Sequence, residues 1–145
     1  MTGFERPLDK TAAKQLNPVV LAFVGDAVYS LYVRSRLVCS GEGRASEFQR
    51  AASRIVSAKG QSDFLETLLP RLTEEEAELY RRGRNAKKAT KSKNASAVDY
   101  NRSTGFETVL GFLYLTGDEG RIEELLSSLD GSLFCGEKAA TAYKP

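Results

Sequence analysis

Two acidic residues stand alone in apolar stretches of this chain. Asp26 is the only charged residue of positions 15–33, and Glu107 is the only one of positions 103–117. A carboxylate in an apolar helix is costly unless something compensates its charge. Two neighbouring carboxylates repel each other unless they share a proton or a cation. The chemistry that this pair could do is therefore the binding of a cation.

Glycines lie beside both acids, although glycine is costly inside a helix. Gly25 precedes Asp26, and Gly111 follows Glu107 by one turn. Small residues at these positions let two helix backbones approach closely. We therefore predict that the two apolar helices cross here and bring the two carboxylates together. The alternative is that each acid is solvated or paired with a nearby arginine, as most single carboxylates are.

The composition limits the chemistry further. The chain has no histidine, which removes His-assisted catalysis and most zinc sites. Its two cysteines, Cys39 and Cys135, lie far apart with no metal-ligand spacing, so we expect free thiols. Oxygen ligands alone favour Mg²⁺, which needs only one or two carboxylates together with waters and substrate phosphate.

Positive charge is concentrated in one segment, residues 81–93. Without its seven basic residues, the remaining chain has 14 basic and 19 acidic residues, a net charge of −5. Such clustering is typical of a phosphate-binding surface. The alternatives are a solvated loop and, for two of the arginines, interaction with a helix dipole. The residues expected to bind phosphates are Arg81, Arg82, Arg84, Asn85, Lys87, Lys88, Lys91 and Lys93.

The pattern predicts an all-α fold, a single helical bundle without a second domain. Asn17 and Pro18 are a strong helix start, and Thr73 with Glu76 forms a capping-box sequence. A chain of 145 residues corresponds to about one domain, with its core at about 15–129. Helices are expected over about 17–38, 45–56, 61–69, 73–82, 99–115 and 119–129, with a loop over 83–97 and an irregular tail over 131–145.

Four stretches resemble a known family. LAFVGDAVYSLYVRSRL (21–37) resembles the signature helix of the ribonuclease III catalytic domain, and FETVLGFLYL (106–115) resembles that family's second acidic helix. SRIVSAKGQ (53–61) and RRGRNAK (81–87) narrow the resemblance to the compact Mini-ribonuclease III class. The larger enzymes continue into a double-stranded-RNA-binding domain where this chain ends, so we expect no such domain.

The resemblance implies an all-α, ribonuclease III-type endonuclease domain that works as a homodimer. It implies Mg²⁺-dependent hydrolysis of double-stranded RNA that leaves 5′-phosphate and 3′-hydroxyl ends. Compact members trim precursors of large-subunit (23S) ribosomal RNA in the cytoplasm. Asp26 and Glu107 then hold the metal as catalytic residues, and Ser103 and Thr104 are expected to orient water around it.

The match to the larger enzymes is partial. Their signature helix has a second glutamate where this chain has Ala22, and their second acidic helix has an aspartate where it has Thr104. With fewer carboxylates, we expect one Mg²⁺ per subunit, or weak binding without RNA. The missing acids also leave open a non-catalytic RNA-binding or ribosome-associated module on the same fold. A helical adapter for protein interactions explains neither the acids nor the basic segment.

A duplex has two strands to cut, and a twofold dimer supplies two related sites. The helix around Asp26 is too apolar all round for one core, so its far side, near Tyr32, Val33 and Leu37, is our predicted dimer interface.

The N-terminus is charged and unlike a signal peptide, and the acid inside the apolar stretch argues against a membrane span. We therefore expect a soluble cytoplasmic protein with no membrane partner.

Overall fold

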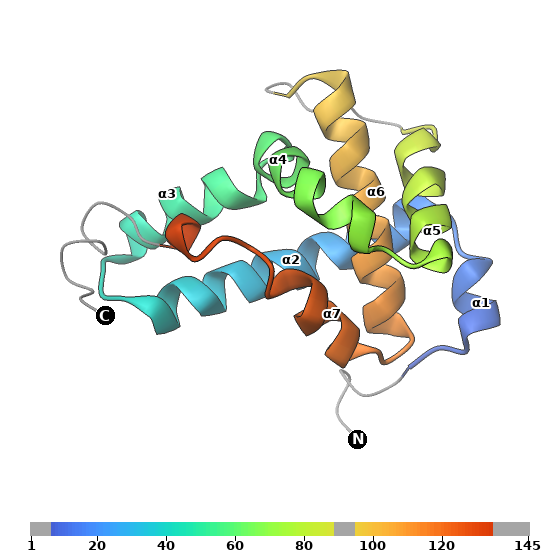
Figure 1. The fold of residues 1–145 in the computed structure, drawn as a ribbon, viewed down its shortest axis with the longest axis horizontal. Helices are drawn as coiled ribbons and strands as arrows, with labels where there is room; N and C mark the ends of the chain where they lie inside the picture. Colours follow the sequence, from blue (N-terminus) through green and yellow to red (C-terminus); the bar gives the residue numbers. More distant parts are fainter. Residues whose placement is uncertain (1–6, 89–94, 135–145) are drawn as a thin grey trace.

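The computed structural model describes residues 7–88 and 95–134, and within them the chain is helical with no strand. Figure 1 shows the long helix α2 running through the molecule, with α6 crossing it. Helices α4 and α5 pack against α6, and α3 lies along the C-terminal part of α2. No helix in the described part of the chain is both long enough and apolar enough to span a bilayer. The helices are α1 (Lys10–Lys14), α2 (Pro18–Ser40), α3 (Ala45–Val56), α4 (Ala58–Leu68), α5 (Glu74–Asn85), α6 (Ala97–Leu115) and α7 (Glu119–Leu126), with 3-10 turns at Leu69–Arg71 and Gly131–Phe134.

Local signals set the ends of the two central helices. Asn17 caps α2, its side-chain oxygen accepting a hydrogen bond from the Val19 amide at 2.8 Å, and Pro18 follows at the first helical position. Ser96 caps α6 in the same way. Gly117 follows α6 with φ +83°, a conformation that glycine adopts without strain. The two starts and the α6 end confirm the expectations to within about two residues.

The crossing of α2 and α6 confirms the role predicted for the glycines. A Cβ atom built on Gly25 would overlap the Glu107 carbonyl oxygen, and one on Gly111 would overlap the Leu21 carbonyl. The helix backbones therefore touch at this point. The core spreads from this contact through Tyr29 and Phe106, whose rings pack edge to face at 5.0 Å.

Three expected boundaries differ from the structure by three residues each, and α1 was not expected at all. Helix α7 ends at Leu126 and not near residue 129. Helix α4 begins at Ala58 because Ser57 caps it, its hydroxyl accepting from the Gly60 amide at 3.0 Å. Helix α5 continues to Asn85, so the loop expected from residue 83 begins three residues later. Gly83 stays helical because it packs against α6, where an added Cβ would lie 2.9 Å from the Gly105 Cα. The capping box of Thr73 and Glu76 is formed as predicted.

The surface of α2 differs from the prediction. Val33 and Leu37, expected at a dimer interface, are 0% and 3% exposed and belong to the core of the single chain. The helix turns a different row of side chains to solvent, spaced by three, four and seven residues: Val20, Phe23, Ala27, Leu31 and Val38. The predicted positions were wrong because a helix that is apolar all round carries no periodic signal for its buried side.

Candidate active site

Asp26 of α2 and Glu107 of α6 lie together at the crossing of these helices. The two carboxyl groups share a hydrogen bond, and both line one surface hollow. Their meeting follows from the close approach of the backbones at Gly25 and Gly111. The polar lining of the hollow comes from four segments of the chain, namely Asp26, Gln61, Lys88, Tyr100, Ser103, Thr104 and Glu107.

Without a cation, the carboxylates of Asp26 and Glu107 would repel each other if both were ionised. Burial, the hydrogen bond to Asp26 and the charge of Asp26 together raise the pKa of Glu107 to about 9, against an opposing hydrogen bond from Gln61. Asp26 itself is exposed, and Glu107 is partly buried. The hollow therefore opens to solvent on the side of Asp26. The pair therefore holds a proton at neutral pH, and a bound cation would have to displace it.

Gln61 is a site residue that sequence reasoning missed. It is 2% exposed, and its amide nitrogen donates to the Val56 carbonyl at 2.9 Å. It also hydrogen-bonds Glu107, while its amide oxygen has no partner within residues 7–88 and 95–134. Its place at the end of the stretch SRIVSAKGQ was the available signal. An uncharged residue at one position gives no chemical hint until the fold places α4 beside α6.

A second polar group near Glu107 is also unsatisfied. The hydroxyl of Tyr29 is buried and has no hydrogen-bond partner among the described residues. Burial, and then the neighbouring Tyr32 and Glu107, raise the pKa of this phenol. Tyr29 therefore stays neutral beneath the surface of the site and adds no charge to it.

Ser103 and Thr104 lie in the hollow, but their hydroxyl protons are already used. Both side chains donate to the Tyr100 carbonyl, at 2.8 Å and 3.0 Å, and both are buried. A hydroxyl in this state still accepts hydrogen bonds. The two residues can therefore accept from water in the hollow but cannot donate to it.

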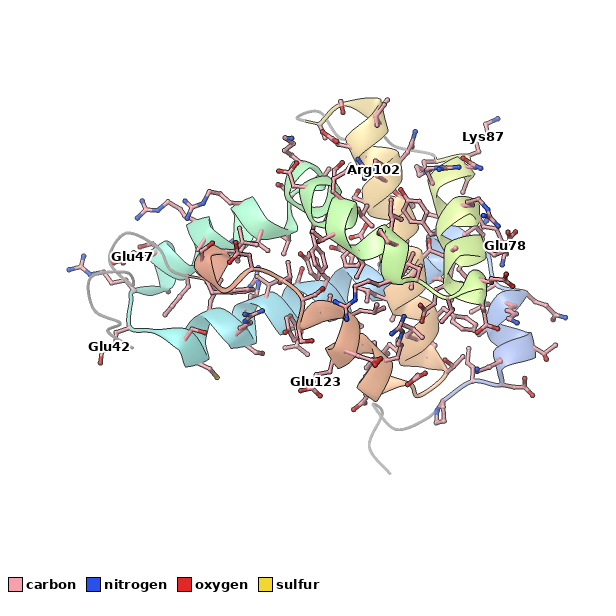
Figure 2. The ribbon with its side chains drawn as sticks, viewed as in Figure 1. Glu42, Glu47, Glu78, Lys87, Arg102 and Glu123 are labelled. Atoms are coloured by element: carbon pink, nitrogen blue, oxygen red, sulfur yellow. The ribbon has the colours of Figure 1, made fainter. Side chains whose placement is uncertain are left out.

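The basic residues of α5 divide into two groups. Arg82 faces inward, where its guanidinium donates to the carbonyls of Lys14 and Leu16 at 3.1 and 3.4 Å, so it ties α5 to the end of α1. Arg84 lies 5.7 Å from the Tyr80 ring centroid and is exposed. Lys87, beyond the end of α5, extends away from the body of the molecule (Figure 2). Arg81 and Asn85 are also exposed, with Arg81 paired to Glu78; Lys91 and Lys93 lie outside the described residues.

Lys88 has a structural contact that the sequence did not suggest. Its ammonium donates to the carbonyls of Ala86, Gly83 and Arg84, at 2.7, 3.1 and 3.3 Å, and so caps the C-terminus of α5. Desolvation lowers its pKa. Lys88 also lines the hollow, but these contacts hold its ammonium on the end of α5.

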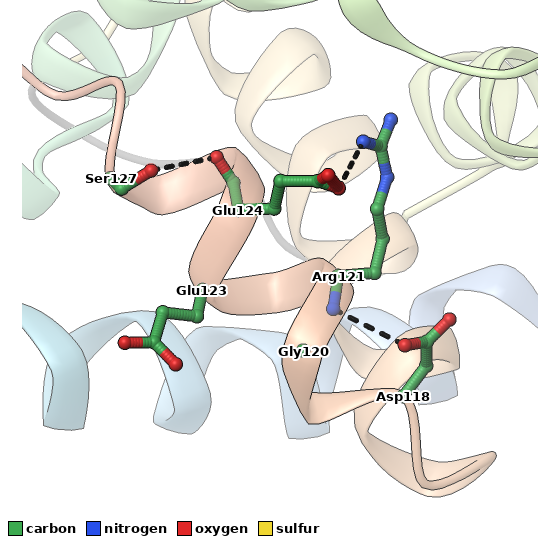
Figure 3. A pocket seen from close by; sticks show the side chains of 6 residues that line it. All are labelled: Asp118, Gly120, Arg121, Glu123, Glu124 and Ser127. Atoms are coloured by element: carbon green, nitrogen blue, oxygen red, sulfur yellow. Dashed lines mark hydrogen bonds and ion pairs between the residues drawn. The ribbon is translucent and has the colours of Figure 1, made fainter.

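Helix α7 borders a second hollow, shown in Figure 3. Two of the acidic residues at this hollow already have partners. Glu124 forms an ion pair with Arg121 at 2.9 Å, and Asp118 caps α7. Arg121 also forms a 2.8 Å ion pair with Glu76, which anchors α7 on α5. This hollow is part of the scaffold and offers no free set of ligands.

The residues at the crossing fit a hard divalent cation. Across residues 7–88 and 95–134 no group of three or more His, Cys, Asp or Glu side chains gathers to form a metal site. Two carboxylates and the unpaired oxygen of Gln61 remain as oxygen donors at the crossing. This set matches an ion that keeps several waters and completes its shell with substrate phosphate.

Comparison with known proteins gives the class of this helical domain, that of the ribonuclease III-like nucleases. The family model named Ribonuclease III domain matches residues 19–118, which include Asp26 and Glu107. The chain belongs to this family and is an endoribonuclease of its type.

Known relatives place the chain more closely within the family. It is 49% identical to Mini-ribonuclease 3 of Brevibacillus brevis over 76% of this chain and 82% of the relative. It is 46% identical to Mini-ribonuclease 3 of Enterococcus faecalis over 79% and 88%. A crystal structure of a Fusobacterium nucleatum protein superposes with a TM-score of 0.72 at 25% identity, covering 79% of this chain and 93% of that one. The fold and the resemblance expected from the sequence are confirmed.

Proposed function

We propose that this protein is a Mg²⁺-dependent endoribonuclease that hydrolyses double-stranded RNA and leaves 5′-phosphate and 3′-hydroxyl ends. Its substrate in the cytoplasm is the precursor of large-subunit (23S) ribosomal RNA. The observation that supports the proposal is the Asp26–Glu107 pair, whose carboxyl groups are joined by a hydrogen bond and line one solvent-facing hollow. A module that only binds RNA does not need these two acids, and their mutual repulsion destabilises the fold.

In this proposal Asp26 and Glu107 hold the ion. When bound, Mg²⁺ lowers the pKa of a coordinated water and offsets charge that develops on the phosphate. The exposed side of the hollow, next to Asp26, admits the RNA backbone. Ser103 and Thr104, which have acceptor oxygens to spare, orient water on the inner side.

Arg84 and Lys87 are the described cations best placed to contact the duplex. Both are exposed near the end of α5, and the adjacent Lys88 reaches the hollow itself. Contacts of this kind are made to phosphates, so they contribute affinity without sequence selectivity.

The working unit in this proposal is a homodimer built on α2. Phe23, Leu31 and Val38 are 80%, 63% and 59% exposed along one side of the helix. An apolar row of this kind marks an interaction surface, and a second copy of the chain satisfies it by twofold symmetry. Because Asp26 lies on the same helix, the dimer axis brings two sites to one duplex.

Incubation of the purified protein with a long RNA duplex, with and without Mg²⁺, tests the activity. We expect cleavage only with the metal, 5′-phosphate ends on the products, and no cleavage of single-stranded RNA of the same sequence. Duplex that is bound but stays intact at saturating Mg²⁺ would instead support the non-catalytic alternative. A 23S precursor transcript then tests the substrate, by comparison with an unrelated duplex of equal length.

A further inference from the structure

The side chain of Gln61 is held in one orientation by its neighbours. Its amide nitrogen donates to the Val56 carbonyl, 2.9 Å away, and a hydrogen bond also joins Gln61 to the Glu107 carboxylate. Both partners are acceptors, so the amide nitrogen must face both of them. A flipped amide would set its oxygen against two oxygens. The orientation is therefore determined by the network.

This orientation leaves the amide oxygen of Gln61 without a partner. It is buried, and Tyr29 is the one other described residue with a buried side-chain oxygen or nitrogen that lacks a hydrogen bond. The two do not bond each other, since both are unpaired. Buried polar groups in proteins are almost always satisfied. The missing partner is therefore something that the site takes up.

The surroundings of Gln61 indicate what that partner is. Gln61 lines the same hollow as Asp26 and Glu107, and it comes from α4, a third helix at the crossing of the other two. Ala22 and Thr104, which also line the hollow, supply no carboxylate. A cation held by two carboxylates keeps several waters, and each of them needs an acceptor.

We propose that Gln61 is a positioning residue of the metal centre. Its amide nitrogen fixes the direction of the Glu107 carboxylate, and its unpaired oxygen accepts a hydrogen bond from a water held by the ion. This inference rests on the proposed metal-dependent function and adds a third, uncharged side chain to its site. Residues that orient metal ligands in this way affect metal affinity nearly as strongly as the ligands do.

Binding of Mn²⁺ to the full chain, followed by calorimetry and by electron paramagnetic resonance, tests the proposal without RNA. Gln61→Met is close in volume but lacks the amide, and we expect Mn²⁺ affinity to fall about 10- to 100-fold. The matched control is Gln49→Met, because Gln49 is exposed on α3 and donates only to Ser53 at 3.3 Å. A folded Gln61→Met protein that binds Mn²⁺ within twofold of the wild type overturns the proposal.

Gln61→Glu decides the question if the methionine variant does not fold. It keeps the size of the side chain but sets a carboxylate oxygen against the Val56 carbonyl and Glu107, so we expect a lower Tm than the wild type without metal. Its other oxygen puts a third carboxylate where the amide oxygen lies, so we expect tighter Mn²⁺ binding and a larger Mn²⁺-induced rise in Tm. Unchanged Mn²⁺ binding would place the Gln61 oxygen away from the ion and overturn the proposal.

Cleavage assays separate this inference from the proposed function. A positioning role predicts that Gln61→Met needs more metal for half-maximal cleavage but recovers most of its rate at saturating metal. Wild-type protein that binds Mn²⁺ yet leaves duplex RNA intact would contradict the function and leave the role of Gln61 standing. Normal cleavage by Gln61→Met at every metal concentration would contradict the inference alone.

Discussion

Gly25 of α2 and Gly111 of α6 face each other backbone to backbone. A Cβ atom on Gly25 would lie 2.9 Å from the Gly111 nitrogen, and one on Gly111 would lie 3.1 Å from the Gly25 nitrogen. The first distance is shorter than a methyl group allows, and the second is tighter than most contacts of a methyl group. This approach fixes the helix crossing, and the crossing brings Asp26 and Glu107 together.

Gly111→Ala should therefore destabilise the fold. The added methyl group meets the Leu21 carbonyl, which belongs to a helix backbone and cannot move aside. We expect a loss of about 3 kcal/mol in the free energy of unfolding, measured by urea denaturation. Gly120→Ala is the matched control: nothing lies within 4 Å of its added Cβ, so a gain of about 0.5 kcal/mol is expected. Equal effects of the two substitutions would refute the close crossing.

Asp26→Asn should abolish cleavage and leave the fold and RNA binding largely intact. Asparagine keeps the shape of the side chain but loses the charge that holds the cation, so the rate should fall about 1,000-fold or more. Asp63→Asn is the control, since Asp63 is exposed and pairs only with Lys59 at 2.8 Å. Near wild-type cleavage by Asp26→Asn would remove Asp26 from the metal site.

The raised pKa of Glu107 predicts an unusual pH dependence of stability. The folded, metal-free chain keeps this proton up to pH about 9, whereas the unfolded chain loses it near the ordinary value of 4.5. The folded state binds more protons in this window, so its contribution to the free energy of unfolding falls as pH rises. Thermal unfolding of wild type and Glu107→Gln between pH 5 and 9 measures the effect. The variant should lack this component, and parallel curves would argue against the shared proton.

Metal affinity should depend on the same proton. The cation binds the ionised carboxylates, so Mg²⁺ or Mn²⁺ must displace the proton from the pair. Affinity should rise with pH up to about 9 in the wild type. Calorimetry in buffers of different ionisation enthalpy counts the released protons, and binding without proton release would contradict this account.

Exposed cations on and just beyond α5 should carry the salt dependence of RNA binding. Replacing Arg84 and Lys87 by glutamine should weaken binding to all duplexes alike and reduce the slope of log K against log salt by about 0.9 for each lost contact, if duplex RNA behaves like B-DNA. Arg82→Gln is the contrast, because its guanidinium holds the carbonyls of Lys14 and Leu16. It should lower stability by about 1 kcal/mol and leave the slope unchanged. A slope that falls only in Arg82→Gln would reverse these assignments.

The exposed side of α2 predicts how the dimer is broken. Leu31→Asp places a charge in the apolar row, and sedimentation at micromolar concentration should show a monomer that cuts long duplex RNA poorly. Val98→Asp is the control, since Val98 is 65% exposed and lies at the start of α6, away from that row. A wild-type protein that sediments as a single chain and still cuts both strands would contradict the dimer.

Local sequence signals alone predicted several helix starts and the crossing of the two central helices. Asn17 with Pro18 and the capping box at Thr73 mark helix starts because a cap satisfies backbone groups only a few residues away. The isolated acids and the glycines beside them predicted the crossing, since both depend on what a helix can tolerate at one position. These features depend on neighbours in the chain, so they can be read without the fold.

The tertiary structure decided the rest, because it depends on which elements pack together. Helix α2 is apolar all round, so only its packing against α6 and α3 determined that Val33 is buried and Leu31 exposed. The sequence predicted that Lys88 binds phosphate. In the structure its ammonium donates to three carbonyls at the end of α5. Gln61 carries no charge and no motif of its own. It became part of the site because α4 packs against α6 and leaves one amide oxygen unpaired beside Glu107.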